Sequence, residues 1–222
     1  MDNSLIEYWN TFGSYVPGLL YSCMIVMEIA LLSIFLSWIL GLFAALGKNS
    51  RLGVLRRPCE FYIWFMRGTP SLIHIFLIYF ALPQFGLAFS PFVAGVIALS
   101  IGSGAYVAEV FRSGLSAIPR GQGESAQALG MGPVLTMRRI VLPQVVRIIV
   151  PSLTNEAINT LKNTSLLSTI TVLELTLFTQ MAIAATFRPF EFYIAAALLY
   201  LVMTTLLSQF ANWHEKRYTL HI

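Results

Sequence analysis

Long apolar stretches constrain this chain more than any other feature. Four of them are clear, and one more is interrupted by polar residues. In chain order, with the interrupted stretch fourth, they cover approximately residues 17–46, 61–82, 92–111, 148–185 and 192–210. A helix needs about 20 apolar residues to cross the hydrocarbon core of a bilayer. The pattern therefore predicts an all-α integral membrane protein with five transmembrane helices.

The composition supports a bilayer environment. Charged residues make up 11% of the chain and hydrophobic residues 57%, whereas soluble domains carry roughly 25% charged residues. The basic residues are dispersed and form no aromatic-basic face, so we expect no nucleic acid partner. Cys23 and Cys59 are far apart, and the three histidines form no ligand cluster, so we expect no metal site.

The basic residues fall almost entirely on one side if the N-terminus lies outside. The predicted inner side holds Lys48, Arg51, Arg56, Arg57, Arg67, Arg112, Arg120, Arg138, Arg139, Arg147, Lys216 and Arg217. The outer loops hold only Arg188, with Lys162 left aside because its depth is open. Because Lys and Arg stay on the cytoplasmic side, this asymmetry predicts N-out and C-in. Splitting the fourth stretch at Lys162 into two full spans would reverse the C-terminus, so we favour one interrupted element.

A polar, glycine-punctuated loop covers residues 113–147. Residues 124–129 are predicted to form a short helix that Gly130 stops. Residues 136–141 are predicted to form a second short helix before Pro143. A rigid helical knob of this kind could dock on a soluble partner, and an ordinary amphipathic surface helix is the alternative.

The spacing within this loop resembles that of ABC importer permeases. Their motif is Glu-Ala-Ala, three residues, Gly, nine residues, then Ile-x-Leu-Pro. This chain has Glu124-Ser125-Ala126, Gly130 and Ile140-Val141-Leu142-Pro143 at that spacing, with Ser125 as the one departure. Three further segments resemble the polar amino acid branch of the family: Arg67-Gly68-Thr69-Pro70, Gly114 to Gly123, and Leu161 to Leu166.

The resemblance implies a multi-subunit importer in the bacterial cytoplasmic (inner) membrane. Two permease subunits, identical or similar, would pair above two ATPase subunits, and an extracytoplasmic binding protein would deliver an amino acid. The implied ATPase-coupling residues are Glu124, Ser125, Ala126, Gly130, Ile140, Leu142 and Pro143. Ala126 would be small so that the loop helix fits a cleft of the ATPase. ATP and Mg would bind to the partner ATPase and no cofactor to this chain, which has no phosphate-binding Gly-x-x-x-x-Gly-Lys-Ser/Thr loop.

Ionisable residues within the spans are candidates for the substrate path, because burying a charge in a bilayer costs about 2.5–3.5 kcal/mol. Glu28 is expected to face the path, with an internal pair to Lys162 or a hydrogen bond to a neighbouring helix as the alternative. Further candidates gather where the fourth stretch is interrupted: Glu156, Asn159, Lys162, Thr164, Ser165 and Glu174. A break near Lys162 would expose backbone groups to substrate, whereas Glu156 and Lys162 could instead extend to the headgroups. Glu174 could line the path or hydrogen-bond across helices.

For other polar and small residues, a role in packing is a simpler explanation than a role in the substrate path. Glu109 is expected to pair with Arg112 three residues on, and His74 is expected to be a packed histidine with its hydrogen bonds satisfied. Two rows of small residues at four-residue spacing would let helices approach closely: Ala94, Ala98 and Gly102, then Ser100, Gly104 and Ala108. Either they pack within the chain, or one row faces a second permease subunit.

Three classes of function fit a hydrophobic chain of this kind. The resemblance favours a transport subunit that is not itself an enzyme. An integral membrane enzyme or assembly factor is the alternative, but no catalytic cluster is visible in the sequence. A channel is disfavoured because no filter-like repeat appears.

Overall fold

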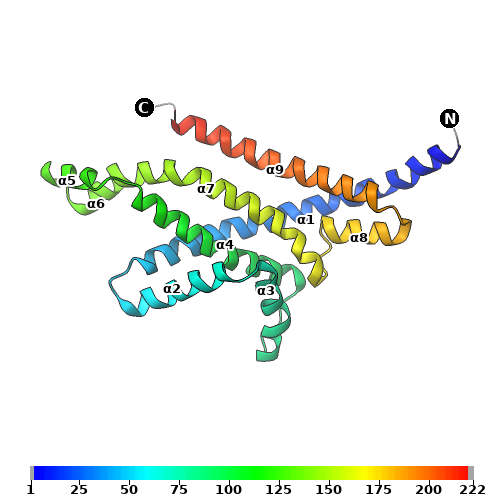
Figure 1. Cartoon of the computed structure of the whole chain (residues 1–222), viewed down its shortest axis with the longest axis horizontal. Helices are drawn as coiled ribbons and strands as arrows, with labels where there is room; N and C mark the ends of the chain where they lie inside the picture. Colours follow the sequence, from blue (N-terminus) through cyan, green and yellow to red (C-terminus); the bar gives the residue numbers. More distant parts are fainter. Residues whose placement is uncertain (1–2, 220–222) are drawn as a thin grey trace.

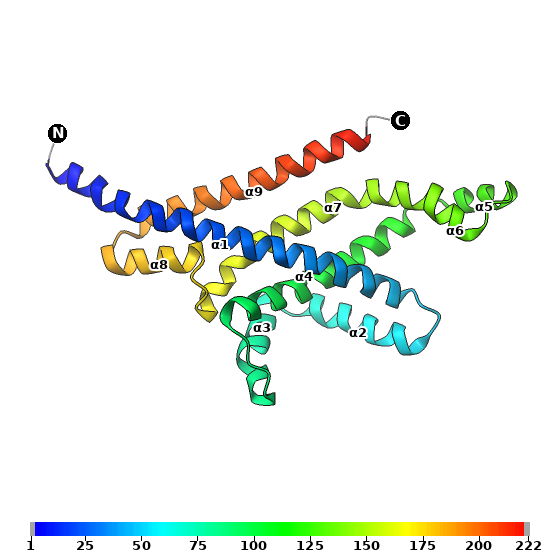
Figure 2. The same cartoon turned by 180° about the vertical axis from the view of Figure 1, so that it is seen from behind.

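Helix α1 (Asn3–Lys48) runs along most of the structure, a computed structural model that describes residues 3–219 (Figure 1). The helix continues through Pro17 without a break. It packs most extensively on α4 (Pro91–Ser116), and α7 (Leu142–Asn163) lies beside both. Helix α9 (Pro189–Thr219) packs on α7 (Figure 2).

Among the described residues, three helices are long and apolar enough to cross a membrane on their own. They are Phe12–Lys48 within α1, the whole of α4, and Pro189–Trp213 within α9. Two pairs of helices pass the same test only together, and each pair is bent. The count reaches five if each bent pair is one span.

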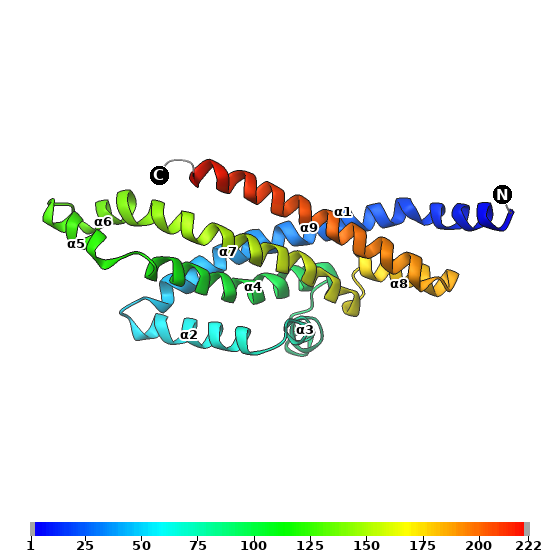
Figure 3. The same cartoon turned by 45° about the horizontal axis from the view of Figure 1, so that its top comes forward.

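The stretch expected as a single span over residues 61–82 is two helices at a corner. Helix α2 (Gly53–Gly68) and the arm of α3 (Ser71–Phe76), η1 (Leu77–Ala81) and η2 (Leu82–Phe85) meet at 113°. In Figure 3, α3 is seen end-on while α2 lies across the view. Pro70 causes the corner, because a residue before proline is forced out of the helical region and Thr69 is extended at φ −123° and ψ 149°.

The second short helix expected over residues 136–141 does not end before Pro143. Helix α6 (Pro133–Thr136), the π-helical turn η3 (Met137–Val141) and α7 follow one another without a gap. A proline ring would collide with the carbonyl four residues earlier in a regular α-helix. Here that carbonyl belongs to Arg139 inside the wider π turn, so the helix accommodates Pro143.

The fourth apolar stretch is interrupted just after Lys162. Helix α7 ends at Asn163, the 3₁₀ segment η4 (Thr164–Ile170) follows, and α8 (Leu175–Thr186) leaves at a bend of 50°. The 12 residues of α8 rise about 18 Å at 1.5 Å per residue, too short for a bilayer core of about 30 Å. The length of α8 therefore favours one interrupted element over two full spans.

Both rows of small residues on α4 are buried inside the chain. A Cβ on Gly41 of α1 would lie 2.5 Å from Val107 Cγ1 and 2.9 Å from the Gly104 carbonyl oxygen. A Cβ on Gly104 would lie 2.8 Å from the Tyr62 hydroxyl. The rows thus serve packing within the chain, and the interpretation that one row faces a second subunit is wrong.

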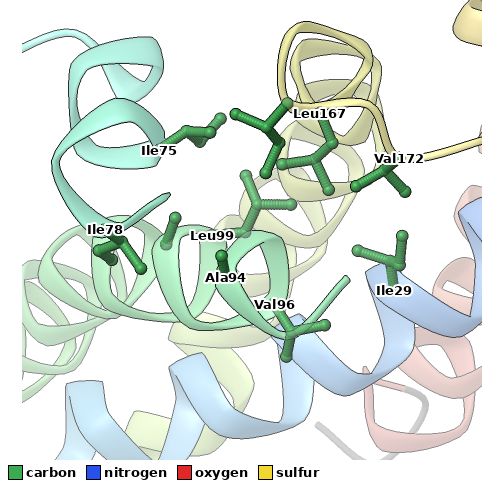
Figure 4. Packing of buried hydrophobic residues seen from close by; sticks show 10 residues of the cluster. Ile29, Ile75, Ile78, Ala94, Val96, Leu99, Leu167 and Val172 are labelled. Carbon is green, nitrogen blue, oxygen red and sulfur yellow. The ribbon is translucent and has the colours of Figure 1, made fainter. Parts of the chain in front are cut away.

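A core cluster ties the two bent elements to the straight helices (Figure 4). Ile29 comes from α1, Ile75 from α3, Leu99 from α4 and Leu167 from η4, and each is at most 3% exposed. Ile78 of η1 and Leu167 and Ile170 of η4 are buried in this cluster, so each irregular segment has one side packed on protein.

The Gly41–Gly104 contact generates a stability prediction. Replacing Gly41 with Val forces α1 away from α4, and we expect a loss of about 1–3 kcal/mol of stability. Thermal unfolding of the detergent-solubilised protein measures it. Gly13→Val is the matched control on the same helix, because no atom lies within 4 Å of its added Cβ. Equal unfolding midpoints for the two variants would contradict the packing argument.

Candidate functional site

The polar loop forms a compact helical knob at one end of the molecule (Figure 1). Helix α5 (Arg120–Ala128) folds back against α6 and η3. The short helix expected over residues 124–129 is present and begins four residues earlier than expected. In Figure 3 the knob and the turn between α8 and α9 lie at opposite ends of the long helices.

The three residues of the Glu-x-Ala segment have different surroundings. Glu124 and Ser125 are exposed, whereas Ala126 is only 1% exposed. Its side chain points into the knob, where Thr136 of α6 is also buried. The small size of Ala126 therefore lets α5 pack on its own return segment. The expectation that it fits a partner's cleft is wrong, because a buried methyl group offers no contact surface.

Gly130 stops α5 through a complete C-terminal cap. Its φ of +77° is left-handed, which glycine adopts without a Cβ clash. Its N–H donates to the Gln127 carbonyl at 2.9 Å, and the Met131 N–H donates to the Ala126 carbonyl at 3.0 Å. These two bonds form the Schellman arrangement. The helix stop expected at Gly130 is thus confirmed, and Gly130 fixes where the knob turns.

Ile140, Leu142 and Pro143 lie on the return segment rather than on α5. Ile140 is in η3 and partly buried, while Leu142 and Pro143 begin α7 and are exposed. The Gln144 side-chain amide donates to the Ile140 carbonyl at 2.8 Å. This bond satisfies a carbonyl at the π turn, so the Ile-x-Leu-Pro segment sets the path from the knob into α7.

Gly130 gives the second prediction. Gly130→Ala places a Cβ in the left-handed region at a cost of about 1–2 kcal/mol, so the end of α5 should fray. Hydrogen exchange followed by mass spectrometry should show faster exchange over residues 124–131. Gly132→Ala is the control, because Gly132 has a φ of −68° and open space around it. Faster exchange in both variants would exclude the cap as the cause.

A polar stripe runs along the exposed face of α7. Its exposed residues follow at spacings of three and four: Ser152, Asn155, Asn159 and Lys162. The buried face carries Ile149, Leu153 and Ala157 on the opposite side. Asn159 and Lys162 are among the candidates expected from the sequence, whereas Ser152 and Asn155 are not. Their helical spacing with Lys162 was the signal that could have found them.

The other candidates near the break differ in exposure. Thr164 is fully buried, its hydroxyl donates to the Leu161 carbonyl at 2.8 Å, and the Ser165 hydroxyl donates to the Lys162 carbonyl at 2.8 Å. Glu156 is partly buried next to Ser103. The exposed stripe therefore includes Asn159 and Lys162, whereas Thr164 supports the helix end behind it.

Glu28 lies on the exposed face of α1, opposite Val26, Ile29 and Ala30. Within residues 3–219 no ion pair joins Glu28 to Lys162. The alternative of an internal pair is therefore wrong. The carboxylate points away from the core of its own chain.

Glu174 is fully buried and caps the N-terminus of α8. Its carboxylate accepts the N–H groups of Thr176 and Leu177 at 2.8 and 2.9 Å and the hydroxyl of Tyr200 on α9 at 3.0 Å. Of the two possibilities for Glu174, hydrogen bonding across helices is the one observed. The residue holds the broken element together and does not line an open path.

His74 is buried as expected, but only one ring nitrogen has a partner. Thr69 Oγ1 donates to the Phe65 carbonyl at 2.8 Å and therefore accepts from His74 Nε2 at 2.6 Å. Nδ1 is buried without a partner among the described residues, so the expectation of a satisfied histidine is wrong in this respect. The Thr69–His74 bond spans the corner between α2 and α3 and helps to hold it.

An apolar cavity of about 570 Å³ opens between α1, α4, α7 and α9. Among the described residues that line it, Thr154 supplies the only hydroxyl group, and Trp38, Phe111 and Leu207 are among the rest. It offers no charged group to a polar solute. Among the described residues, no group of three or more His, Cys, Asp or Glu side chains could hold a metal ion.

The helical membrane fold and the knob define the class of protein, and comparison with known proteins gives the family. Residues 37–220 match the family model described as "Binding-protein-dependent transport system inner membrane component". The chain belongs to this family. The match covers the loop motif, the broken fourth element and the whole described length of α9.

Named relatives cover nearly the whole chain. "Probable amino-acid ABC transporter permease protein YckA" of Bacillus subtilis is 37% identical over 212 residues, 96% of this chain and 92% of that protein. "Octopine transport system permease protein OccM" of Rhizobium meliloti is 38% identical over 226 residues, 95% of this chain and 91% of that protein.

Solved structures agree on the fold. A crystal structure of an amino acid ABC transporter with histidines superposes with a TM-score of 0.88 at 37% identity, covering 93% of this chain and 96% of that chain. An inward-facing MetNI methionine ABC transporter superposes with a TM-score of 0.74 at 16% identity, covering 99% and 100%. At 16% identity, the match to the methionine transporter is evidence for the fold only. The chain thus has the fold of importer permeases, as the sequence predicted.

Proposed function

We propose that this chain is the membrane-spanning subunit of an ATP-driven importer of polar amino acids and forms half of its translocation path. The exposed polar stripe on α7 is the observation that carries the proposal. Uncompensated polar groups facing lipid are costly, so polar residues in spans face a bundle interior or a water-filled cavity. The stripe faces away from the core of its own chain, which fits a path shared with a second subunit.

The chemistry of the stripe suits an amino acid. Asn155 and Asn159 can donate to a carboxylate and accept from an ammonium group, and Lys162 adds a positive charge. Glu28 on α1 adds a negative charge on another exposed face. The relatives named as amino acid permeases support the substrate class. The apolar cavity does not compete as the substrate site, because it lacks such groups.

The knob is the proposed point of coupling to ATP hydrolysis. It is compact, capped at Gly130 and continuous with α7 through η3, so a push on α5 would move α7 as a rigid lever. The charge asymmetry of the loops favours a cytosolic knob with the N-terminus outside. Two ATPase subunits that bind ATP and Mg would dock there, and a binding protein would approach from the other side. The family assignment to an inner membrane component supports this arrangement.

Glu124→Arg tests the coupling. The exposed carboxylate is expected to contact the ATPase, so reversing its charge should abolish most substrate-stimulated ATP hydrolysis in proteoliposomes while leaving the chain inserted. Gln122→Arg is the matched control, because Gln122 lies on nearly the opposite side of α5 and is also exposed. Normal coupling in Glu124→Arg, or equal loss in both variants, would refute the role of Glu124.

Lys162→Gln tests the path. Losing a charge that contacts the substrate should raise the KM for uptake about tenfold, because hydrogen bonds to charged groups contribute about 1.5–3 kcal/mol. Arg147→Gln removes the same charge from an exposed position near the start of α7 and should leave KM unchanged. The KM of each variant is measured as uptake by the assembled complex in vesicles, tested across the amino acids. An unchanged KM in Lys162→Gln would remove this residue from the path.

A further inference from the structure

Four charged side chains from three helices meet where α1 ends. Glu109 of α4 accepts from Lys48 Nζ at 2.5 Å and from Arg112 Nε at 2.8 Å. Arg67, near the end of α2, brings Nη1 within 3.7 Å of Glu109 Oε2 and lies over the Tyr106 ring at 5.6 Å. The pair of Glu109 with Arg112 expected from the sequence is confirmed, but it accounts for only one of three cations.

The charge of this cluster is not balanced within the chain. One carboxylate faces three cations, which leaves a surplus of two positive charges. Lys48 and Arg112 take both Glu109 oxygens, whereas Arg67 at 3.7 Å is beyond hydrogen-bonding distance. Among the side chains that the structure describes, those of residues 12–213, Arg67 has only the Glu109 ion pair and the Tyr106 ring as partners, and its side chain is 44% exposed. Its planar fork of donors is therefore open to a ligand, and such a fork matches phosphate.

The end of the first candidate span brings this cluster near the membrane boundary. Arg56, Glu60 and Arg67 form one stripe along α2, in the same row as the buried Ile63, and Arg67 faces α4. The exposed aromatic side chains of Phe61 and Trp64 lie beside this stripe. Phe61 is 62% exposed and Trp64 is 70% exposed. A helix with a charged stripe next to exposed Trp and Phe is typical of the membrane–water boundary. Lys48 is also the last residue of the first candidate span.

We propose that Lys48, Arg67 and Arg112, arranged around Glu109, bind the phosphate of an anionic lipid headgroup. Arg67 is the principal donor, and Tyr106 holds its guanidinium in place. Glu109 keeps the other two cations close together against their mutual repulsion. The bound lipid joins the ends of α1, α2 and α4. The site requires only that the chain lies in a membrane and does not depend on the transported substrate.

Arg67→Gln tests the site in the purified transporter complex. The probes are phosphatidylglycerol and phosphatidylcholine, titrated into detergent and counted on the complex by native mass spectrometry. The wild type should retain phosphatidylglycerol preferentially, and Arg67→Gln should weaken its binding about fivefold, the effect expected of one basic residue near an anionic lipid. Arg56→Gln is the matched control on the same stripe, because Arg56 lies outside the cluster around Glu109 and faces Glu60 instead.

The outcomes separate the possible ligands. Equal retention of phosphatidylglycerol by the wild type and Arg67→Gln would overturn the proposal, as would loss of an ATPase subunit with lipid retention unchanged. Displacement of the lipid by inorganic phosphate would assign the site to a soluble anion and overturn the lipid assignment. If Arg67→Gln does not assemble, Arg67→Lys keeps the charge without the fork. It should weaken retention by less, and unchanged retention would equally refute the role of Arg67.

Discussion

The structure depends on one constraint, that backbone polar groups within a bilayer must find partners inside the protein. Straight helices meet it by themselves, but this chain has a corner at Pro70 and a break after Asn163. Each irregularity has a dedicated side chain. The Thr69 hydroxyl donates to the Phe65 carbonyl at the corner, and the Glu174 carboxylate accepts two backbone N–H groups where α8 begins. Irregular backbone is therefore tolerated where polar side chains and core packing support it.

Two π-helical turns show how proline redirects a helix without ending it. Each turn is followed immediately by Leu-Pro, at Leu82-Pro83 after η1 and at Leu142-Pro143 after η3. In both cases the carbonyl four residues before the proline lies inside the wider turn, where it avoids the ring. At Pro83 the arm soon ends at Gly86, which has a φ of +82°, whereas at Pro143 the helix continues to Asn163. The segment after the proline decides the outcome: a short apolar tip in one case, the amphipathic α7 in the other.

Sequence reasoning predicted the features that depend on local pattern. The five apolar segments, the helix stop at Gly130 and the pair of Glu109 with Arg112 needed only periodicity, turn chemistry or a spacing of three. Features set by tertiary packing were beyond it. Nothing local shows that Ala126 points inward, that both small-residue rows of α4 are covered by the same chain, or that Arg67 returns to Glu109. The corner could have been predicted from Pro70, but the apolar residues on either side of it favoured a single span.

The exposed charges form two groups, which face different kinds of surface. Lys48, Arg67 and Arg112 gather around one carboxylate beside exposed aromatic rings, a setting suited to headgroups. Lys162 instead ends a stripe of neutral hydrogen-bonding side chains, with no acidic partner in the described part of the chain. A lysine facing hydrocarbon in that setting would be costly, so its face needs water or another polar surface. The proposed assembly, in which α7 faces a second subunit, would meet that requirement.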